Sequence, residues 1–324
     1  MKLHTADELK EKFEFFLFNT ALKETSKNLS KSILQIMDTK AKRIRPLLLL
    51  TACEAYGADF NTGLPAASAI EIYHNFTLVH DDIIDNSDQR RNVETVHKKF
   101  GINKAILTGD MMLIHAYNLL EDYQNNISSI LFHSFGKVAR EVIEGEQMDV
   151  DFEFEEIVSL DNYIEMIRLK TAVLLATSLK MGAIIGGANY SDQEIIYDMG
   201  INLGLAFQIK DDYLDSFGDE LLFGKKIGGD ILQNKKTYLL CKAYSKASPD
   251  EKSEIEDITH KLEGKEKIDA MIQIYQKMNI HDDAMKEMED YFENVLSGLW
   301  KLSVDDKNKT RLLQLIETIY HRAF

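Results

Sequence analysis

In this 324-residue chain, the residues best suited to take part in a reaction are the aspartates of one carboxylate motif that occurs twice. The motif Asp-Asp-x-x-Asp occurs first at Asp81, Asp82 and Asp85, and again at Asp211, Asp212 and Asp215. On a helix, side chains four residues apart lie on one face, with about 5–6 Å between their Cβ atoms. Each copy therefore predicts a pair of neighbouring carboxylates, formed by its first and third aspartates.

Such a pair of carboxylates favours a hard cation. The two like charges repel each other unless a cation neutralises them, and Mg2+ keeps water ligands while it bridges carboxylates to phosphate oxygens. A single acidic helix end is often only solvated surface. Two copies with the same spacing, each at the end of an apolar helix, instead favour metal binding. The sequence therefore predicts Mg2+ together with a diphosphate.

Two other acidic segments do not fit this pattern. His281-Asp282-Asp283 is followed by Met285 and Lys286, where a third carboxylate is needed, so we predict no metal there. The acidic run over residues 149–156 alternates charged side chains between two expected helices, and we interpret it as a solvated loop.

Basic residues gather beside the expected start of one helix. Lys42, Arg43 and Arg45 stand next to Pro46, which suits the first turn of a helix. Because the N-terminal end of a helix carries positive charge, this cluster is a favourable place for a phosphate.

A second basic group lies beside the first carboxylate motif. Arg90 and Arg91 follow it directly, and the forked donors of arginine match phosphate oxygens better than the point charge of lysine does. His74 lies seven residues, or two helical turns, before Asp81 and so projects on the same face. The remaining cations that could contact phosphate are Lys170, Lys225 and Lys235.

The elements that must position these residues are helices. Only three prolines interrupt the chain, and between them apolar residues recur at steps of three and four, which predicts an all-α fold. The expected helices cover residues 5–20, 28–38, 44–56, 65–86, 103–124, 127–147, 161–181, 191–217, 231–246, 249–279, 281–301 and 305–322. No loop is long or biased enough to be an interdomain linker, so we expect one domain over residues 1–324.

The composition excludes several functional classes. The chain has 38 basic and 53 acidic residues, and its net charge of −15 argues against a non-specific nucleic-acid or anionic-membrane binder. Cys53 and Cys241 lie in apolar runs and predict buried thiols in a reducing compartment. No signal segment is recognised, and no stretch approaches the ~20 apolar residues of a membrane helix. We therefore expect a soluble, cytoplasmic protein with no integral membrane segment.

Taken together and in order, these motifs closely resemble the polyprenyl synthetase family, the head-to-tail trans-isoprenyl diphosphate synthases. The resemblance covers most of the chain and is carried by Lys42-Arg43-Ile44-Arg45-Pro46, His74, Leu78-Val79-His80-Asp81-Asp82-Ile83-Ile84-Asp85, Arg90-Arg91, Thr95-Val96-His97, Lys170-Thr171, Phe207-Gln208-Ile209-Lys210-Asp211-Asp212-Tyr213-Leu214-Asp215, Gly224-Lys225, Gly228-Gly229-Asp230 and Lys235-Lys236-Thr237.

This resemblance implies a single orthogonal helix bundle around a deep central cavity, the isoprenoid synthase type of fold, assembled as a homodimer. It also implies a prenyltransferase whose reaction is Mg2+-assisted ionisation of an allylic diphosphate, condensation with isopentenyl diphosphate and elimination of a proton. The protein would position the reactants and stabilise charge, without a nucleophilic side chain or an organic cofactor.

The resemblance further implies a role for each matching residue. The metal residues would be Asp81, Asp85 and Asp211, with Asp82, Asp212 and Asp215 as further ligands or as support behind the ligands. Isopentenyl diphosphate would be held by Lys42, Arg45, His74 and Arg91. The allylic diphosphate would be held by Arg90, Lys170, Lys225 and Lys235. Thr171 and Gln208, together with Lys170, would face the developing carbocation as the catalytic group.

The sequence departs from the family pattern at three places. Lys40-Ala41 replaces a Gly-Gly pair before Lys42, Asn92 replaces the usual glycine after the arginine pair, and Glu146 stands where a glutamine commonly follows a glycine. None of these changes removes a carboxylate of the motifs or a phosphate-binding cation. They concern loop geometry and substrate positioning.

Aromatic residues before the first motif bear on product length. On an ideal helix Tyr73 lies two turns below Asp81, about 12 Å along the axis, and could form the floor of the cavity. The resemblance points instead to Phe76, five residues before Asp81, which an ideal helix places on the flank. Two large rings favour a short product, C15 or C20, unless both are ordinary core residues.

Three alternative functions remain open at this point. A longer-chain polyprenyl diphosphate synthase would lack the bulky floor. A catalytically inactive regulatory subunit of a heteromeric synthase would not need intact carboxylate motifs. A terpene cyclase would not need Lys42, Arg45 and Arg91 to hold a second diphosphate.

Overall fold

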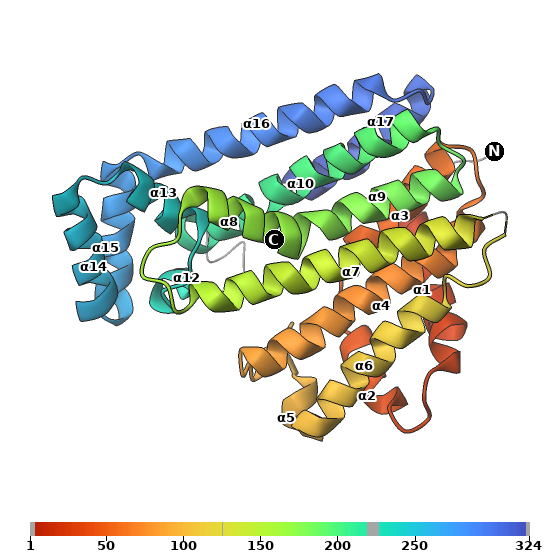
Figure 1. Cartoon of the computed structure of the whole chain (residues 1–324), viewed down its shortest axis with the longest axis horizontal. Coiled ribbons are helices and arrows are strands. Elements are labelled where there is room, and N and C mark those ends of the chain that lie inside the picture. Colours follow the sequence, from red (N-terminus) through yellow and green to blue (C-terminus); the bar gives the residue numbers. More distant parts are fainter. Residues whose placement is uncertain (1–3, 125, 219–226, 322–324) are drawn as a thin grey trace. The chain divides into compact units, whose positions relative to one another are not determined.

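The computed structural model describes residues 4–124, 126–218 and 227–321, and it confirms the all-α prediction (Figure 1). The first elements are α1 (Ala6–Asn19), the 3-10 helix η1 (Ala21–Glu24), α2 (Ser30–Met37), α3 (Ile44–Ala55), α4 (Phe60–Ile84), β1 (Gln89–Arg90), β2 (Val93–Glu94), α5 (Val96–Phe100), α6 (Ile102–Asn118) and α7 (Ile127–Phe152). The later elements are α8 (Leu160–Ile167), the π-helical turn η2 (Arg168–Ala172), α9 (Val173–Ile185), α10 (Tyr190–Phe217), α12 (Gly229–Leu232), α13 (Tyr238–Lys246), α14 (Pro249–Lys261), α15 (Gly264–Lys277), α16 (Ile280–Lys301) and α17 (Asp306–His321).

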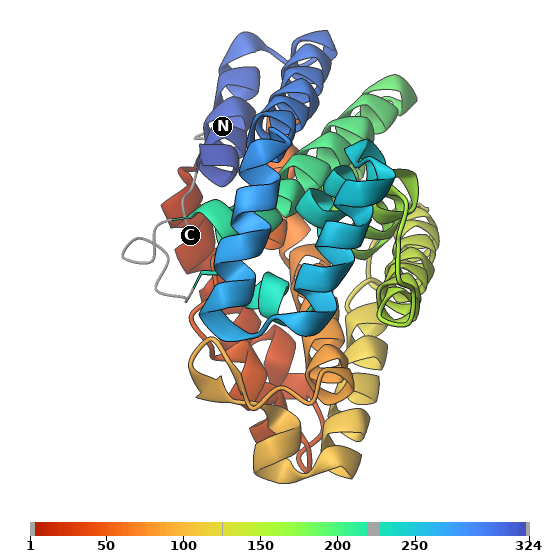
Figure 2. The same cartoon turned by 90° about the vertical axis from the view of Figure 1, so that its left-hand side faces the viewer.

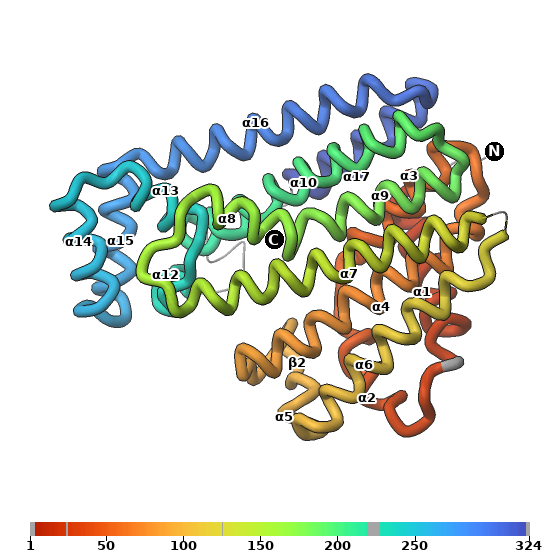
Figure 3. Tube along the Cα trace, viewed as in Figure 1, coloured from red at the N-terminus to blue at the C-terminus, as the bar shows by residue number. Residues whose placement is uncertain are grey.

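The chain separates into two compact units. Unit 1 comprises residues 1–137, 177–196 and 303–315, and unit 2 comprises residues 138–176, 197–302 and 316–324. The boundary falls inside α7, α9, α10 and α17, and Figure 3 traces the chain through these helices. Each unit is described by itself below, and the single domain expected over residues 1–324 stays a prediction.

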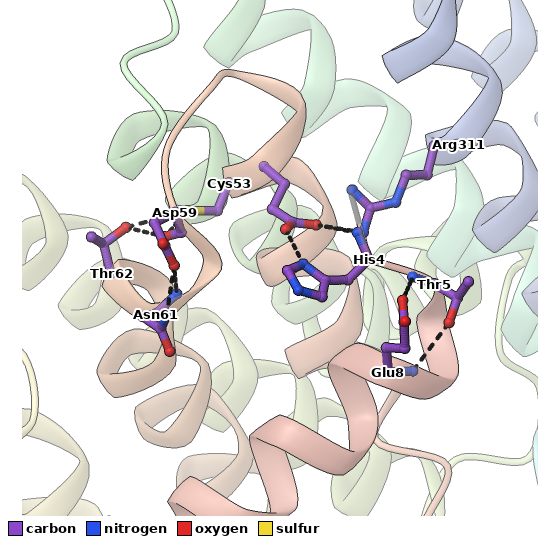
Figure 4. Close-up of polar contacts among 9 residues, drawn as sticks. His4, Thr5, Glu8, Cys53, Asp59, Asn61, Thr62 and Arg311 are labelled. Carbon is purple, nitrogen blue, oxygen red and sulfur yellow. Dashed lines mark hydrogen bonds and ion pairs between the residues drawn. The ribbon is translucent and has the colours of Figure 1, made fainter. Parts of the chain in front are cut away.

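In unit 1 the long helix α4 packs against α3 and α6 and carries the first carboxylate motif. The sequence pattern placed its start at Pro65, but the helix begins at Phe60 because the Asp59 side chain caps it, accepting a hydrogen bond from the Asn61 amide at 2.8 Å (Figure 4). Pro65 removes one helical hydrogen bond. Beside it, the Tyr123 hydroxyl accepts from the Ala66 amide at 3.2 Å and donates to the Thr62 carbonyl at 2.7 Å, so it bridges the next helical hydrogen-bond pair.

The first and last segments of unit 1 are bound to one helix. Glu54 of α3 is 2% exposed, and its carboxylate contacts His4 at 2.6 Å and Arg311 of α17 at 2.5 Å (Figure 4). Next to His4, Thr5 and Glu8 form a capping box that starts α1. A carboxylate this deeply buried is stable only when it is paired, so Glu54 ties both segments to α3.

Unit 2 has its own apolar core, formed by helices α8, α10, α13, α15 and α16 around residues such as Tyr238 and Tyr275. Helices α14 and α15 lie side by side (Figure 2). One continuous helix was expected over residues 249–279. The structure divides it, because Leu262 and Glu263 have extended backbone and Gly264 adopts a positive φ of 56°.

Among the residues that the structure describes, one helical stretch is long and apolar enough to span a membrane. Residues Leu160–Gly186 have a mean hydropathy of 1.4 in their most apolar window, so the expectation that no stretch would qualify is wrong. Within that window 78% of the residues are buried by the rest of the protein. A buried helix of this kind is typical of the core of a soluble protein.

Candidate functional site

The first carboxylate motif ends α4 in unit 1. Asp85 is exposed and caps the helix, whereas Asp82 is only 1% exposed. Asp82 accepts a hydrogen bond from Arg90 Nε at 2.7 Å. Burial raises the pKa of Asp82, and the Arg90 guanidinium opposes that shift. Asp82 therefore holds Arg90 beside the motif, while the helical spacing places Asp81 and Asp85 as the neighbouring pair.

A cluster of arginines surrounds His74 in the same unit. Burial is the largest cause that lowers the pKa of His74, and the charges of Arg45, Arg91, Arg90 and Arg43 lower it further, so His74 is a neutral imidazole. Burial also lowers the pKa of Arg45 to about 10. The Nε atom of Arg45 is buried, with no hydrogen-bond partner among the described residues. This concentration of positive charge, with Arg45 and Arg90 half-buried, is suited to an anionic ligand.

Two of these arginines have unusual backbone conformations. Among the described residues other than glycine, positive φ occurs at asparagines and at Arg43 and Arg91. Arg43 has a φ of 53°, and its side chain donates to Glu71 and to the Met37 carbonyl, both at 2.6 Å. Arg43 is thus committed to internal contacts, which agrees with its omission from the expected diphosphate ligands.

Arg91 lies in the two-residue turn between β1 and β2. Arg90 pairs with Val93, so the turn consists of Arg91 and Asn92, with φ values of 54° and 62°. Hairpin turns of the type I′ class need positive φ at both positions, and asparagine adopts this conformation readily. Asn92 therefore preserves the loop in which a glycine was expected. The Arg91 side chain donates to Thr39 at 2.9 Å.

The second carboxylate motif lies on α10 in unit 2, and its middle residue is enclosed by protein donors. Asp212 is 3% exposed. One carboxylate oxygen accepts from Gln208 Nε2 at 3.1 Å, and the other accepts from the Tyr163 hydroxyl and from the Tyr238 amide, the latter at 2.8 Å. Burial raises the pKa of Asp212 to about 7. This arrangement favours support behind the ligands, one of the two roles expected for Asp212, over direct metal binding.

The outer aspartates of this motif are more accessible. Asp211 is exposed, and Asp215 is half-buried with one oxygen accepting from the Asp230 amide at 2.9 Å. Burial raises the pKa of Asp215, and the Asp230 amide and Lys235 oppose the shift. Asp211 and Asp215 therefore form the pair that this helix can offer to a cation.

The hydrogen bond to Asp212 sets the orientation of the Gln208 side chain and of its contact with Thr171. Gln208 turns its NH2 group toward Asp212, which accepts from it as a carboxylate. Its oxygen then faces Thr171, whose hydroxyl donates to it at 3.0 Å. Thr171 lies on η2, and π-helical turns of this kind are frequent at functional sites.

Lys170, on the same π-helical turn, is held by two carboxylates of α7. Its Nζ lies 2.8 Å from Glu146 and 2.5 Å from Asp149. Burial opposes the charge of Lys170, but these carboxylates outweigh burial and raise its pKa. The expectation that Asp149 belongs to a solvated loop is wrong, because α7 continues to Phe152.

Among the described residues of unit 2, Lys235 is the other cation that the sequence singled out for phosphate binding. Burial opposes its charge, whereas Asp230, Asp212 and Asp149 raise its pKa. Lys235 and Lys170 are thus linked electrostatically through Asp149, so two expected phosphate-binding residues lie close to one carboxylate.

Each unit contains its own share of the expected site residues. In unit 1 these residues are Lys42, Arg45, His74, Asp81, Asp82, Asp85, Arg90 and Arg91, and in unit 2 they are Lys170, Thr171, Gln208, Asp211, Asp212, Asp215 and Lys235. Lys225 lies outside the described residues. Over the described ranges, no group of three or more histidine, cysteine or acidic side chains could hold a metal ion by itself. Sequence reasoning missed Tyr163, because no local pattern links it to Asp212.

The fold and these motifs define a class of protein, the trans-prenyl diphosphate synthases of the all-α isoprenoid synthase fold. The family described as Polyprenyl synthetase matches residues 26–278, and the chain belongs to that family. The chain is therefore a prenyltransferase. The expectation from the sequence motifs is confirmed.

Individual relatives agree with this assignment. The chain is 35% identical over 309 residues to a geranylgeranyl diphosphate synthase of Saccharolobus solfataricus, which covers 93% of this chain and 92% of that protein. A crystal structure of a geranylgeranyl pyrophosphate synthase matches with a TM-score of 0.90 and 42% identity, over 97% of this chain and 99% of that one. A geranylgeranyl pyrophosphate synthase from Corynebacterium glutamicum, complexed with isoprenyl diphosphate and magnesium, matches with a TM-score of 0.84 and 26% identity, over 98% of each chain.

Proposed function

We propose that this prenyltransferase makes a C20 product, geranylgeranyl diphosphate, by adding isopentenyl diphosphate to shorter allylic diphosphates. The observation that carries this proposal is the likeness to geranylgeranyl diphosphate synthases over nearly the whole chain. The basic cluster around His74 and the pair Lys170 and Lys235 supply cations for two diphosphate substrates. A terpene cyclase would need only one such group.

The metal in this proposal is Mg2+. The donors available in the two motifs are carboxylates, Asp81 with Asp85 and Asp211 with Asp215, and oxygen donors of this kind suit a hard divalent cation. The magnesium bound in the relative from Corynebacterium glutamicum supports the same choice. When bound, Mg2+ would neutralise the negative charge that collects on the leaving diphosphate. Asp82 and Asp212 would not bind the metal directly but would stabilise the motifs through their hydrogen bonds to other protein groups.

The basic cluster of unit 1 is assigned to isopentenyl diphosphate. Arg45 and Arg91 would supply charge and forked donors, with Lys42 as a further cation. His74 would add a hydrogen bond without adding charge, because its surroundings keep it neutral. Since burial already makes the charge of Arg45 costly, an anion placed there lowers the free energy of the charged form.

The allylic diphosphate is assigned to Arg90, Lys170, Lys225 and Lys235. Loss of this diphosphate leaves an allylic carbocation, which the double bond of isopentenyl diphosphate attacks, and a proton is then lost to the departed diphosphate. The oxygens of Thr171 and Gln208 would face the cation. Because Asp212 keeps the Gln208 amide from turning over, these acceptor dipoles are oriented before the reaction begins, which is the electrostatic preorganisation that lowers a barrier.

Product length is assigned to an aromatic wall in unit 1. Tyr73 and Phe76 of α4 are buried with ring centroids 5.4 Å apart, and Tyr73 also packs edge-on against Phe135 of α7 at 5.3 Å. Behind them Tyr117 of α6 lies 4.8 Å from Phe135. Rings that support one another in this way resist displacement by a growing prenyl chain.

We further assign the chain to a homodimer in the cytoplasm. Helix α6 exposes several large apolar side chains, namely Ile102, Ile106, Leu107 and Ile114. An apolar face of this size is typical of a protein–protein interface. Cys53 and Cys241 are buried free thiols, as in proteins of a reducing compartment.

The decisive experiment is product analysis with purified protein. The protein is incubated with Mg2+, isopentenyl diphosphate and, separately, C5, C10 and C15 allylic diphosphates, with an excess of EDTA as the metal-free control. We expect C20 diphosphate from every starter and no product in EDTA. Accumulation of C15, or of chains longer than C20, would reject the proposed length. The absence of condensation with any starter would instead favour an inactive subunit of a heteromeric synthase.

A further inference from the structure

The ion pair between Glu146 and Lys170 has a consequence for substrate binding. Glu146 and Asp149 lie one turn apart on α7, and both carboxylates contact the same Nζ atom of Lys170. An ammonium group has three N–H donors, so two of them are occupied by the protein itself. The three side chains are only 18–29% exposed, so water screens their interaction weakly.

The charge of this trio is negative overall. One ammonium and two carboxylates sum to −1, so a diphosphate that approaches Lys170 meets two anionic groups within hydrogen-bond distance of the cation it needs. Asp149 has a second cationic neighbour, because it also raises the pKa of Lys235. Lys170 is the one cation with which Glu146 forms an ion pair among the described contacts.

The backbone keeps this arrangement in place. A Cβ atom at Gly145 would lie 2.4 Å from the Lys170 amide nitrogen, so the backbones of α7 and η2 are in direct contact. Glu146 follows Gly145 directly, and its backbone therefore cannot withdraw from Lys170 without separating the two helices. The net negative charge around Lys170 must therefore be compensated by the ligand or by a cation that binds with the ligand.

We infer that Glu146 is a specificity-determining residue, an internal anion that occupies Lys170 and makes diphosphate binding at this lysine depend on a divalent cation. A diphosphate without metal competes with Glu146 and is repelled by it. A diphosphate with Mg2+ brings positive charge that compensates for Glu146. This inference rests on the proposed function, because it takes Lys170 as a diphosphate ligand.

The test measures binding of inorganic pyrophosphate by isothermal titration calorimetry, in EDTA and in saturating Mg2+. In EDTA we expect Glu146→Gln to bind at least about tenfold more tightly than the wild type, because one negative charge beside Lys170 is removed. In Mg2+ the difference should shrink to about threefold or less. Glu144→Gln is the matched control, because Glu144 is an exposed residue of the same helix, and it should bind like the wild type in both buffers.

A double variant identifies the partner of Glu146. In Glu146→Gln with Lys170→Gln, the gain in EDTA should disappear, because the released ammonium is no longer there. Equal or weaker binding by Glu146→Gln in EDTA, or a gain that persists without Lys170, would overturn the inference. The binding assay does not require condensation. Failure of the proposed function would therefore be detected independently, as the absence of prenyl product from the wild type.

Discussion

At the scale of single residues, the protein keeps a histidine neutral among arginines. His74 is surrounded by Arg43, Arg45, Arg90 and Arg91, and burial adds to their effect in lowering its pKa. A protonated His74 would add one more charge to a cluster that is already positive. The neutral ring instead offers a hydrogen bond. Keeping the ring neutral lowers the folding stability only in acid.

This residue makes folding stability fall in acid. The unfolded chain binds a proton at His74 near its ordinary pKa of 6.5, whereas the folded protein does not, so unfolding takes up a proton as the pH falls below that value. The contribution is present above about pH 6.5 and is lost at up to about 1.4 kcal/mol per pH unit below it. Urea unfolding at about pH 7.5 and about pH 5.5 should therefore show a smaller acid loss for His74→Gln than for the wild type.

An exposed histidine provides the comparison. His133 lies on the surface of α7, so His133→Gln should lose as much stability in acid as the wild type does. If His74→Gln behaved in the same way as His133→Gln, the neutral imidazole would have to be abandoned.

Asp212 allows the orientation of Gln208 to be reversed. In Asp212→Asn the new amide presents a donor, so the Gln208 amide can turn over and direct its NH2 group toward Thr171. Donor dipoles would then face the carbocation. We expect kcat to fall by about 10²-fold or more, while KM for both diphosphates and the Mg2+ concentration for half-maximal rate stay unchanged.

The steady-state measurement also separates two roles. A large rise in the Mg2+ requirement of Asp212→Asn would mean that Asp212 is a metal ligand and not support behind the ligands. Asp198→Asn is the control, because Asp198 is an exposed residue of the same helix, and its kinetics should match those of the wild type.

At the scale of helices, close packing depends on glycines where backbones cross. In unit 1 a Cβ atom at Gly182 of α9 would lie 2.1 Å from the Leu49 carbonyl oxygen of α3. That oxygen belongs to the backbone of a buried helix and cannot move away alone. Helix α3 also carries Glu54, which binds His4 and Arg311, so its position affects both end segments of the unit.

Gly182→Ala should therefore destabilise the protein by about 1–3 kcal/mol or more. Gly136→Ala is a matched substitution inside α7, where the nearest atom, the Tyr117 hydroxyl oxygen, lies at an ordinary 3.4 Å. Since alanine is the better helix former, that variant should be neutral or more stable by up to about 1 kcal/mol. Urea midpoints measure both, and equal midpoints would show that α3 and α9 can separate without cost.

The aromatic wall between helices α4, α6 and α7 carries the prediction on chain length. Replacing Tyr73 or Phe76 by leucine removes a ring but keeps the position apolar, which limits the loss of stability. We expect the variant that opens the floor to make products longer than C20, detected by chromatography of the dephosphorylated alcohols. Phe15→Leu is the control, because Phe15 is 69% exposed on α1. If both variants make products of unchanged chain length, Tyr73 and Phe76 are ordinary core residues that do not limit product length.

At the scale of the whole molecule, assembly is the property to test. Ile106 and Ile114 are 41% and 58% exposed on α6. Changing both to aspartate places charge on the apolar face and should convert a dimer into a monomer, measured by light scattering after size-exclusion chromatography. Ile143→Asp, on the exposed face of α7, should leave the mass unchanged. A monomeric wild type would contradict the proposed homodimer.

Much of the fold could be predicted because helical periodicity is a local property. The expected helices over residues 44–56, 191–217 and 281–301 lie within one residue of α3, α10 and α16. Two of the errors arose where one side chain or one backbone conformation decided the boundary. Asp59 starts α4 before Pro65, and Gly264 separates α14 from α15.

The sequence by itself determined the chemistry of the site, because pairs of carboxylates and groups of arginines are defined by residue type and by spacing along one helix. Only the tertiary structure decided which polar atoms are already bound within the protein. Asp211 and Asp212 are adjacent aspartates of the second motif and look alike in the sequence. In the structure, however, Asp212 is enclosed by Tyr163 and Tyr238, which are 49 and 26 residues away along the chain. Burial and hydrogen bonding join residues distant in sequence, and for that reason they leave no local pattern from which these contacts could have been predicted.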